Sequence, residues 1–112
     1  MSNINYYDFM KVDIRVGTIL KAEENNILKK PSIILDIDFG NKIGIKKSSA
    51  QLQANYIPQD LINKQVAAVI NFPSKQIGKT LSEVLVLGFP DKQNEPILIS
   101  PDFKIENGGK LY

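Results

Sequence analysis

The sequence contains neither histidine nor cysteine, and these two absences exclude several kinds of chemistry. Without imidazole or thiol groups, the chain has no histidine general base and no cysteine nucleophile. Zinc sites built from Cys and His, and a disulfide framework, are excluded for the same reason. We therefore expect a protein that binds partners without catalysing a reaction, and we expect no metal site and no cofactor.

Long hydrophobic runs are also missing. The longest, VAAVI and VLVL, are far shorter than the roughly 20 residues that a membrane-spanning helix needs. The opening MSNINYYDFM does not join a basic start to an apolar stretch, as a signal peptide does. We therefore expect no membrane insertion. A cytoplasmic location is the expectation that fits a cysteine-free chain of this kind.

Neither sign of charge dominates, since the net charge is only +2. The basic side chains are nevertheless unusual, because 13 are lysine and only Arg15 is arginine. Lysine is a mobile point charge that suits phosphate backbones better than the bidentate reading of bases. The composition permits a nucleic-acid partner without requiring one.

The length of 112 residues predicts a single domain, residues 1–112, without repeats or linkers. Most of that domain reads as short strands. Residues 13–24 alternate with a period of two, which places Ile14, Val16, Thr18 and Leu20 on one face and Arg15, Gly17, Ile19 and Lys21 on the other. Residues 33–39 alternate more clearly, with Ile33, Leu35, Ile37 and Phe39 on one face and Asp36 and Asp38 on the opposite face. Such alternation is typical of half-buried strands.

The remaining elements follow from local signals. Gly40 and Asn41 tolerate positive φ and predict a tight hairpin into a third strand over residues 42–46. Pro58 suits a first helical position and Asn63 a left-handed stop, which predicts a short helix between them. Strands are then expected over residues 65–72, 82–89 and 96–100, with a loop over 73–80.

This order of elements predicts an all-β fold with a minor helix. Three strands, a short helix and two further strands form the pattern of a five-stranded Greek-key barrel, the OB-fold. From the pattern alone, an SH3-like barrel or a β-sandwich remains as an alternative.

Two apparent chemical motifs are rejected because the residues around them do not fit. The letters GKT at residues 78–80 resemble the end of a phosphate-binding loop, but Pro73 occupies the position of its first glycine and a strand follows in place of a helix. Asp36 and Asp38 share a strand face without a third ligand, as expected for an ordinary solvated face. We predict no nucleotide site and no acidic catalytic pair.

Lysines flank the predicted third strand, the 73–80 loop and the connection between the first two strands. They are Lys29, Lys30, Lys42, Lys46, Lys47, Lys75 and Lys79. Two interpretations stay open at this point. One is an ordinary solvated surface. The other is a basic face of the kind that OB-folds use to bind nucleic acid.

Large apolar side chains crowd the start of the chain, and other aromatics stand near the ends of strands. The segment INYYDFM places Ile4, Tyr6, Tyr7, Phe9 and Met10 ahead of the first strand, where they would cover an open barrel end or a second subunit. Tyr56, Phe72 and Phe89 could stack on bases. The two phenylalanines end alternating strands, so a buried core position is the role expected for them, whereas the role of Tyr56 stays open.

Several segments resemble CsaA-type proteins in the same order along the chain. These segments are DIRVGTILKAE, DIDFG, IGIKKSSAQL, YIPQDLINKQVAAVINFP, KQIGKTLSEVLVLG and the closing ISPD…NGGKL. CsaA-type proteins are similar in turn to the tRNA-binding domain appended to some methionyl- and phenylalanyl-tRNA synthetases. The resemblance runs from about Asp8 to the last residue. It implies an OB-fold with dimerisation extensions at residues 1–12 and 90–112, and therefore a homodimer.

The resemblance also implies two binding functions and the residues for them. In the tRNA-binding family a strand ends in Asn, a basic loop follows and a Ser opens the next strand, as Asn71, Lys75 and Ser82 do here. Leu85, where Met is usual, and the stretch from Lys46 to Ser49 resemble the CsaA branch. The segment HPxADKL is absent, and NNILKKPSIIL with Lys30 stands in its place.

Three residue sets are predicted on this basis. Those for tRNA or other structured RNA are Lys30, Lys46, Lys47, Ser48, Asn71, Lys75, Lys79 and Ser82. Those for unfolded or export-bound polypeptides are Leu52, Ile57, Phe72, Ile77 and Leu81. Those for the dimer interface are Tyr6, Tyr7, Phe9, Met10 and Phe89. The function expected is that of a homodimeric, non-catalytic CsaA-like chaperone, with a tRNA-binding protein acting in trans as the alternative.

Overall fold

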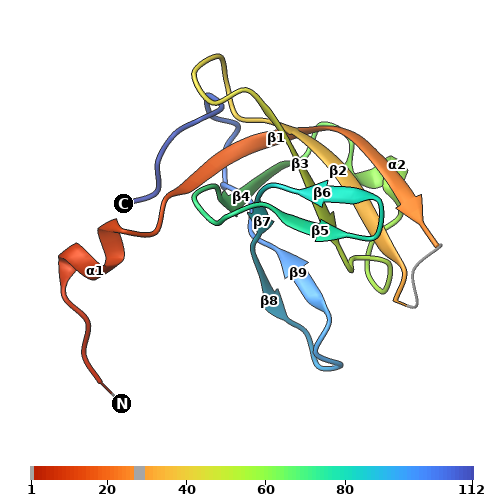
Figure 1. The fold of residues 1–112 in the computed structure, drawn as a ribbon, viewed down its shortest axis with the longest axis horizontal. Helices are drawn as coiled ribbons and strands as arrows, with labels where there is room; N and C mark the ends of the chain where they lie inside the picture. The colour runs from red at the N-terminus through yellow and green to blue at the C-terminus, as the bar shows by residue number, and fades with distance from the viewer. Residues whose placement is uncertain (1, 27–29) are drawn as a thin grey trace.

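The computed structural model describes residues 2–26 and 30–112, and its centre is a curled antiparallel sheet of five strands (Figure 1). The strand order is β3-β2-β1-β4-β7. The strands are β1 (Ile14–Asn25), β2 (Ser32–Asp38), β3 (Ile45–Ala50), β4 (Gln65–Val69) and β7 (Leu85–Val86). Hydrogen bonds from Glu83 N to Lys47 O (2.7 Å) and from Ser49 N to Ser82 Oγ (3.0 Å) join the edge strand β3 to the residues just before β7, the other edge strand. The prediction of an OB-like, mostly β fold with a minor helix is confirmed.

Strand β2 supplies the centre of the core, as its alternation predicted. Ile33, Leu35 and Ile37 are fully buried, and Phe39, directly after the strand, is 1% exposed. Asp36 and Asp38 are only half-buried on the opposite face. The two-residue period therefore determined which face of this strand meets the core.

The predicted faces of β1 hold as far as Leu20, and the face of Gly17 and Ile19 is the one that meets the core. Ile19 is fully buried in the core, whereas Leu20 is 44% exposed. The pairing of β1 with β2 skips one residue between Ile19 and Lys21, and beyond this bulge Ala22 packs against the core where the alternation predicted Lys21. Bulges increase the local bend and twist of a strand, which lets this 12-residue strand wrap around the barrel.

The connection between β2 and β3 is longer than predicted. Gly40 and Gly44 both have φ near +90°, and Gly44 N donates to Gly40 O at 2.7 Å. The hairpin is confirmed, but β3 begins at Ile45 and not at Lys42.

Helix α2 (Pro58–Leu61) matches its predicted signals. Pro58 occupies the first turn, and Asn63 has a φ of +69° just beyond the end of the helix. In the part of the chain that the structure describes, no helix combines the length and the apolar character needed to cross a membrane.

Two hairpins stand outside the barrel sheet, and the sequence predicted only parts of them. The first, β5 (Lys75–Ile77) with β6 (Thr80–Ser82), replaces the predicted loop over residues 73–80, because Gly78 adopts a φ of +60° and permits a tight turn. The second is β8 (Gly88–Pro90) with β9 (Pro96–Leu98). The single strand predicted over residues 82–89 is wrong, since its residues are divided among β6, β7 and β8.

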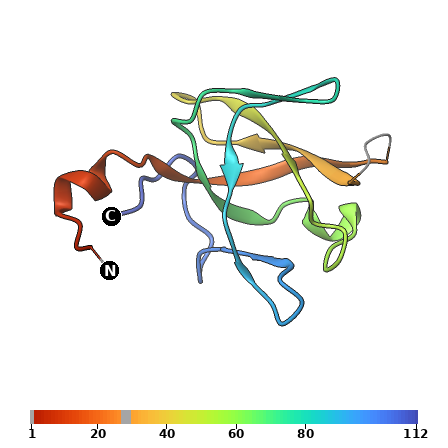
Figure 2. The same ribbon diagram turned by 60° about the horizontal axis from the view of Figure 1, so that its bottom comes forward.

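An N-terminal arm, defined here as residues 2–12, projects from the barrel and carries helix α1 (Tyr6–Met10) (Figure 2). Asn5 caps this helix and exchanges hydrogen bonds with Asp8, which explains how five residues form a defined turn. None of the helix residues is buried. Figures 1 and 2 both show the C-terminus close to the arm.

Candidate functional site

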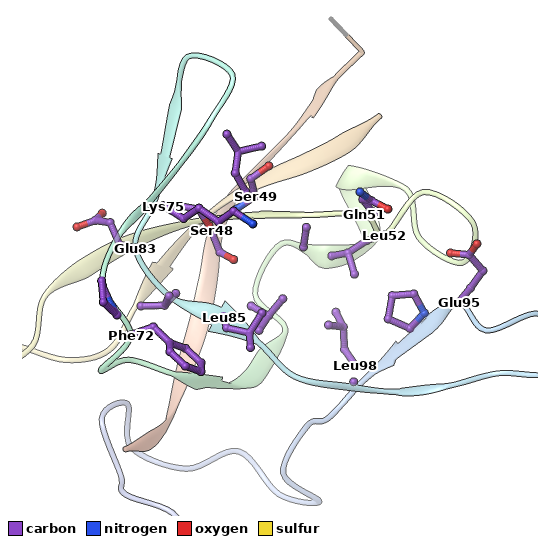
Figure 3. A pocket seen from close by; sticks show the side chains of 18 of the residues that line it. Ser48, Ser49, Gln51, Leu52, Phe72, Lys75, Glu83, Leu85, Glu95 and Leu98 are labelled. Atoms are coloured by element: carbon purple, nitrogen blue, oxygen red, sulfur yellow. The ribbon is translucent and has the colours of Figure 1, made fainter. Parts of the chain in front are cut away.

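A groove of about 740 Å³ opens between strand β3, the β5–β6 hairpin and the β8–β9 hairpin (Figure 3). Its apolar side chains come from segments far apart in the sequence. They include Leu52, Phe72, Ile77, Val84, Leu85, Val86 and Leu98. A concave, mainly apolar surface with a few polar groups at its edge is the usual form of a ligand site.

Three charged side chains stand at the edge of this groove, and they differ in their partners. Glu83 is already engaged, because its Oε1 accepts from Lys47 N at 3.0 Å and its Oε2 lies 3.9 Å from Lys46 Nζ. Lys75 and Glu95 form no ion pair within residues 2–26 and 30–112. Lys75 and Glu95 are therefore the charges available to a ligand in the groove.

The two serines of the predicted RNA set, Ser48 and Ser82, lie buried in the wall of the barrel. Ser82 Oγ accepts a hydrogen bond from Ser49 N at 3.0 Å, and Ser49 Oγ donates to Ser32 Oγ at the same distance. Ser48 lines the groove but is only 1% exposed. The sequence could not show that the Ser82 hydroxyl already accepts a hydrogen bond or that Ser48 is buried.

The predicted lysines fall into two groups. Lys46 and Lys47, on β3, face carboxylates, since Lys47 Nζ lies 2.7 Å from Asp36 Oδ1 and Lys46 faces Glu83. Lys75 and Lys79, on the β5–β6 hairpin, are exposed and have no carboxylate within 4.0 Å in the described chain. The hairpin thus carries the unpaired positive charge beside the groove.

Two further lysines of the predicted flanking set precede β2 in the chain. Lys30 is exposed beside the connection of β1 to β2 and does not line the groove. Lys29 lies outside the described residues.

The structure brings together only part of the predicted polypeptide set. Leu52, Phe72 and Ile77 line the groove, whereas Ile57 and Leu81 are exposed outside its lining. Sequence reasoning missed Leu85 and Leu98 as lining residues. The turn sequence DKQNEP before β9 signals the hairpin that brings Leu98 there, but it does not show where that hairpin packs.

The β8–β9 hairpin is held in place as a wall of the groove by side chains of the 51–57 segment. Asn55 Nδ2 donates to Asp91 Oδ2 at 2.9 Å, and Leu98 N donates to the Tyr56 hydroxyl at 2.9 Å. Asp91 Oδ1 in turn accepts from Gln93 N and Glu95 N within the hairpin turn. Asp91 therefore joins the turn to the barrel.

We expect Asp91→Asn to loosen this wall at neutral pH. The hydrogen bond from Asn55, and then that from the Glu95 backbone, hold the pKa of Asp91 below its ordinary value. A lowered pKa in the folded state means that the stabilisation is complete at neutral pH and is lost only as the pH falls through that value. The parent protein should therefore loosen only in strong acid. Amide hydrogen exchange at Gln93 and Glu95 measures both effects, and equal exchange in variant and parent at pH 7 would contradict the role of Asp91.

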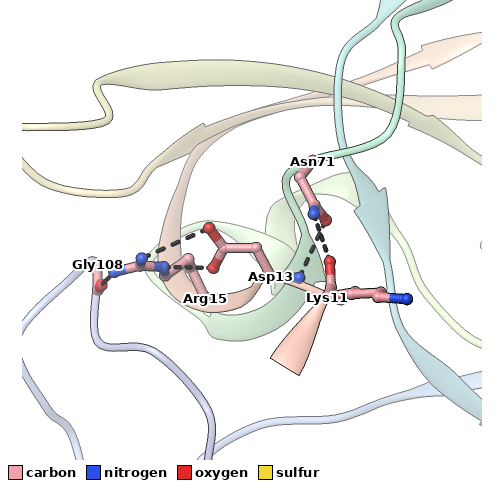
Figure 4. Close-up of polar contacts among 5 residues, drawn as sticks. All are labelled: Lys11, Asp13, Arg15, Asn71 and Gly108. Carbon is pink, nitrogen blue, oxygen red and sulfur yellow. Dashed lines mark hydrogen bonds and ion pairs between the residues drawn. The ribbon is translucent and has the colours of Figure 1, made fainter. Parts of the chain in front are cut away.

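Asn71 is bonded to the N-terminal arm (Figure 4). Its Oδ1 accepts from Asp13 N at 3.0 Å, and its Nδ2 donates to Lys11 O at 2.7 Å. Beside it, Arg15 bridges the Asp13 carboxylate and Gly108 O. These contacts give the amide of Asn71 an intramolecular role.

The predicted interface residues are mostly exposed in the single chain. Tyr6, Tyr7, Met10 and Phe89 are exposed, while Phe9 is half-buried and its ring centroid lies 6.5 Å from that of Tyr6. Ile4, Leu111 and Tyr112 are further exposed apolar side chains of the two terminal segments. The core position expected for Phe72 and Phe89 is wrong, because they are 54% and 67% exposed. Exposed apolar side chains that lie close together commonly mark a contact with another molecule.

Residues 14–110, nearly the whole chain, match the family model described as "Putative tRNA binding domain". The chain belongs to this tRNA-binding-domain family. A curated relative, the methionine–tRNA ligase of Porphyromonas gingivalis, is 28% identical over 109 residues. The alignment includes 97% of this chain but only 16% of the ligase, so the chain spans about a sixth of the length of that relative.

Two solved structures are similar over their full length. A chaperone CsaA from Bacillus anthracis is 42% identical with a TM-score of 0.92, covering 99% of this chain and 100% of that one. A CsaA chaperone protein from Picrophilus torridus is 46% identical with a TM-score of 0.89, covering 98% and 100%. The resemblance to CsaA-type proteins and to the synthetase-appended domain is confirmed.

Proposed function

We propose that this chain is a homodimeric, non-catalytic chaperone of the CsaA kind, which binds unfolded or export-bound polypeptides in the groove beside β3. The groove is the observation that carries the proposal, because a groove with a volume of about 740 Å³ and a mainly apolar lining fits extended apolar segments. The two unpaired charges of Lys75 and Glu95 at its edge suit a polypeptide with mixed polar and apolar side chains. Two solved CsaA chaperones of the same fold support it.

The homodimer is supported by the distribution of exposed apolar side chains. The N-terminal arm and the last two residues lie close together (Figure 2), and they carry exposed Ile4, Tyr6, Tyr7, Met10, Val12, Leu111 and Tyr112. Residues 1–12 and 90–112 are proposed as extensions of one domain, residues 1–112, with the dimer interface between two copies. We place the protein in the cytoplasm as part of the same proposal.

Phe72→Ala tests the groove, with Leu81→Ala as a matched control. Phe72 lines the groove and is 54% exposed, whereas Leu81 is 48% exposed outside the lining. Removing the aromatic ring should raise the dissociation constant for an unfolded polypeptide by about tenfold, since burial of a large apolar side chain contributes about 1.5–3 kcal/mol. Fluorescence anisotropy with a labelled, reduced and unfolded protein measures the constant. Equal affinities of both variants and the parent would exclude the groove.

A tRNA-binding protein acting in trans is the second candidate function. The match to the tRNA-binding-domain family favours it, as does the unpaired charge of Lys75 and Lys79 on the β5–β6 hairpin. Lysines on this hairpin would contact phosphates and so position an RNA backbone. One surface could serve both polymers, and a pull-down from cell lysate with and without nuclease separates RNA partners from protein partners.

A further inference from the structure

We propose that Asn71 is a positioning residue, which fixes the direction in which the N-terminal arm leaves the barrel and thereby controls the association of two copies. The proposal rests on the homodimer of the proposed function. It differs from the sequence-based prediction for Asn71, which placed this residue in direct contact with RNA.

The geometry of Asn71 is that of a two-point clamp. The side chain uses its acceptor for Asp13 N and its donor for Lys11 O, two backbone groups on either side of Val12. A backbone bond from Ile70 N to Asp13 O, at 2.9 Å, adds a third point next to the clamp. Two bonds from one planar amide fix both the position and the orientation of the segment that they hold.

The clamp continues into the C-terminal segment through Arg15. Its Nε donates to Asp13 Oδ1 at 2.7 Å, and its Nη1 donates to Gly108 O at 2.9 Å. Both partners of this ion pair are about a quarter exposed, so solvent screens it only in part. Gly108 itself has a φ of +95°, and a Cβ there would lie 2.5 Å from Phe39 O. The C-terminal segment is therefore seated against the barrel at the same place as the arm.

The arm has few other attachments. In the described chain, no hydrogen bond joins residues 2–10 to the barrel, and helix α1 buries none of its residues. Yet the arm presents large apolar groups, with Tyr7 79% exposed. Since ordering a loose segment lowers affinity, holding the arm in its bound direction beforehand favours association. In this proposal Asn71 acts on association through the backbone of Lys11 and Asp13.

Asn71→Ala tests the inference, with Asn41→Ala as the control. Asn41 is an exposed turn residue for which the described chain shows no side-chain hydrogen bond. Sedimentation equilibrium should show the dimer dissociation constant rise by about tenfold for Asn71→Ala, as expected for about 1.4 kcal/mol from two hydrogen bonds. Amide exchange at Asp13 should accelerate, while exchange in β2 and the melting temperature stay near those of the parent. Asp13→Asn, which weakens only the link to Arg15, should shift both readouts less.

Binding of bulk tRNA by the same variants separates the possible outcomes. A loss of tRNA affinity that disappears at protein concentrations above the dimer constant supports positioning. A loss that persists, with the dimer constant and the exchange at Asp13 unchanged, would identify Asn71 as a direct RNA ligand and overturn the inference. If the parent is monomeric throughout, the homodimer of the proposed function fails, and the exchange at Asp13 alone then decides whether Asn71 holds the arm.

Discussion

Phe39→Ala should lower the free energy of unfolding by about 3–5 kcal/mol, the usual cost of truncating a fully buried phenylalanine. Phe39 is 1% exposed at the end of β2 and belongs to the same core cluster as Ile37 and Leu61. Native domains are stable by only about 5–15 kcal/mol, so this loss is a large fraction of the total stability. Urea denaturation followed by circular dichroism measures the change.

Gly17 provides an internal check on this result. A Cβ at Gly17 would lie 2.6 Å from Ile37 Cγ2 and 2.8 Å from Phe39 Cδ1, so Gly17→Ala alone should overpack the core at a cost of about 1–3 kcal/mol. The double variant Gly17→Ala with Phe39→Ala should then cost less than the sum of the two, because the new methyl group enters the space that the ring leaves. Strict additivity would show that the two residues are not in contact.

Replacing Lys75 and Lys79 together by alanine should weaken tRNA binding by about 100-fold at 0.1 M salt, if the hairpin contacts the RNA backbone. Each lysine that neutralises a phosphate contributes roughly one unit to the slope of log K against log salt. If the variant and the parent bind tRNA equally near 1 M salt, a slope that is smaller by two units makes the affinity of the variant about 100-fold lower at 0.1 M salt. Filter binding of tRNA over a series of salt concentrations measures both the affinity and the slope.

Lys64→Ala with Lys104→Ala is the matched control for this prediction. These two lysines line a separate small pocket, away from the hairpin, and their removal lowers the net charge by the same amount. The control should keep most of the affinity and most of the slope. If both double variants lose affinity equally, binding follows the total charge and the hairpin is not the RNA-binding surface.

Features with strong local signals were predictable from the sequence. The alternation from Ile33 to Phe39 gave the buried face of β2, and Pro58 and Asn63 marked the ends of the short helix. The order of strands around that helix indicated the barrel. In each case the determining interaction is with solvent or with the residue's own backbone, so the sequence pattern carries it directly.

Features that depend on contacts between distant segments were not predictable. The bulge after Ile19 changes which side chains of β1 meet the core, because the strand must curve around its neighbours. No residue type in the sequence predicts this bulge. The strand predicted over residues 65–72 ends at Val69, so Asn71 lies just beyond it, and its bonds to Lys11 and Asp13 cross about 60 positions of sequence. Its partner could not be identified from spacing.

The sequence by itself therefore determined the class of fold, the absence of histidine and cysteine chemistry, and the presence of lysine beside the segment at residues 73–80. Only the tertiary structure decided which lysines remain unpaired, which apolar side chains share one groove, and what holds the arm. The physical reason is that composition and periodicity depend on whether each side chain is exposed to solvent or buried. Ion pairs, grooves and clamps depend instead on which distant segments the folded barrel brings within a few ångströms of one another.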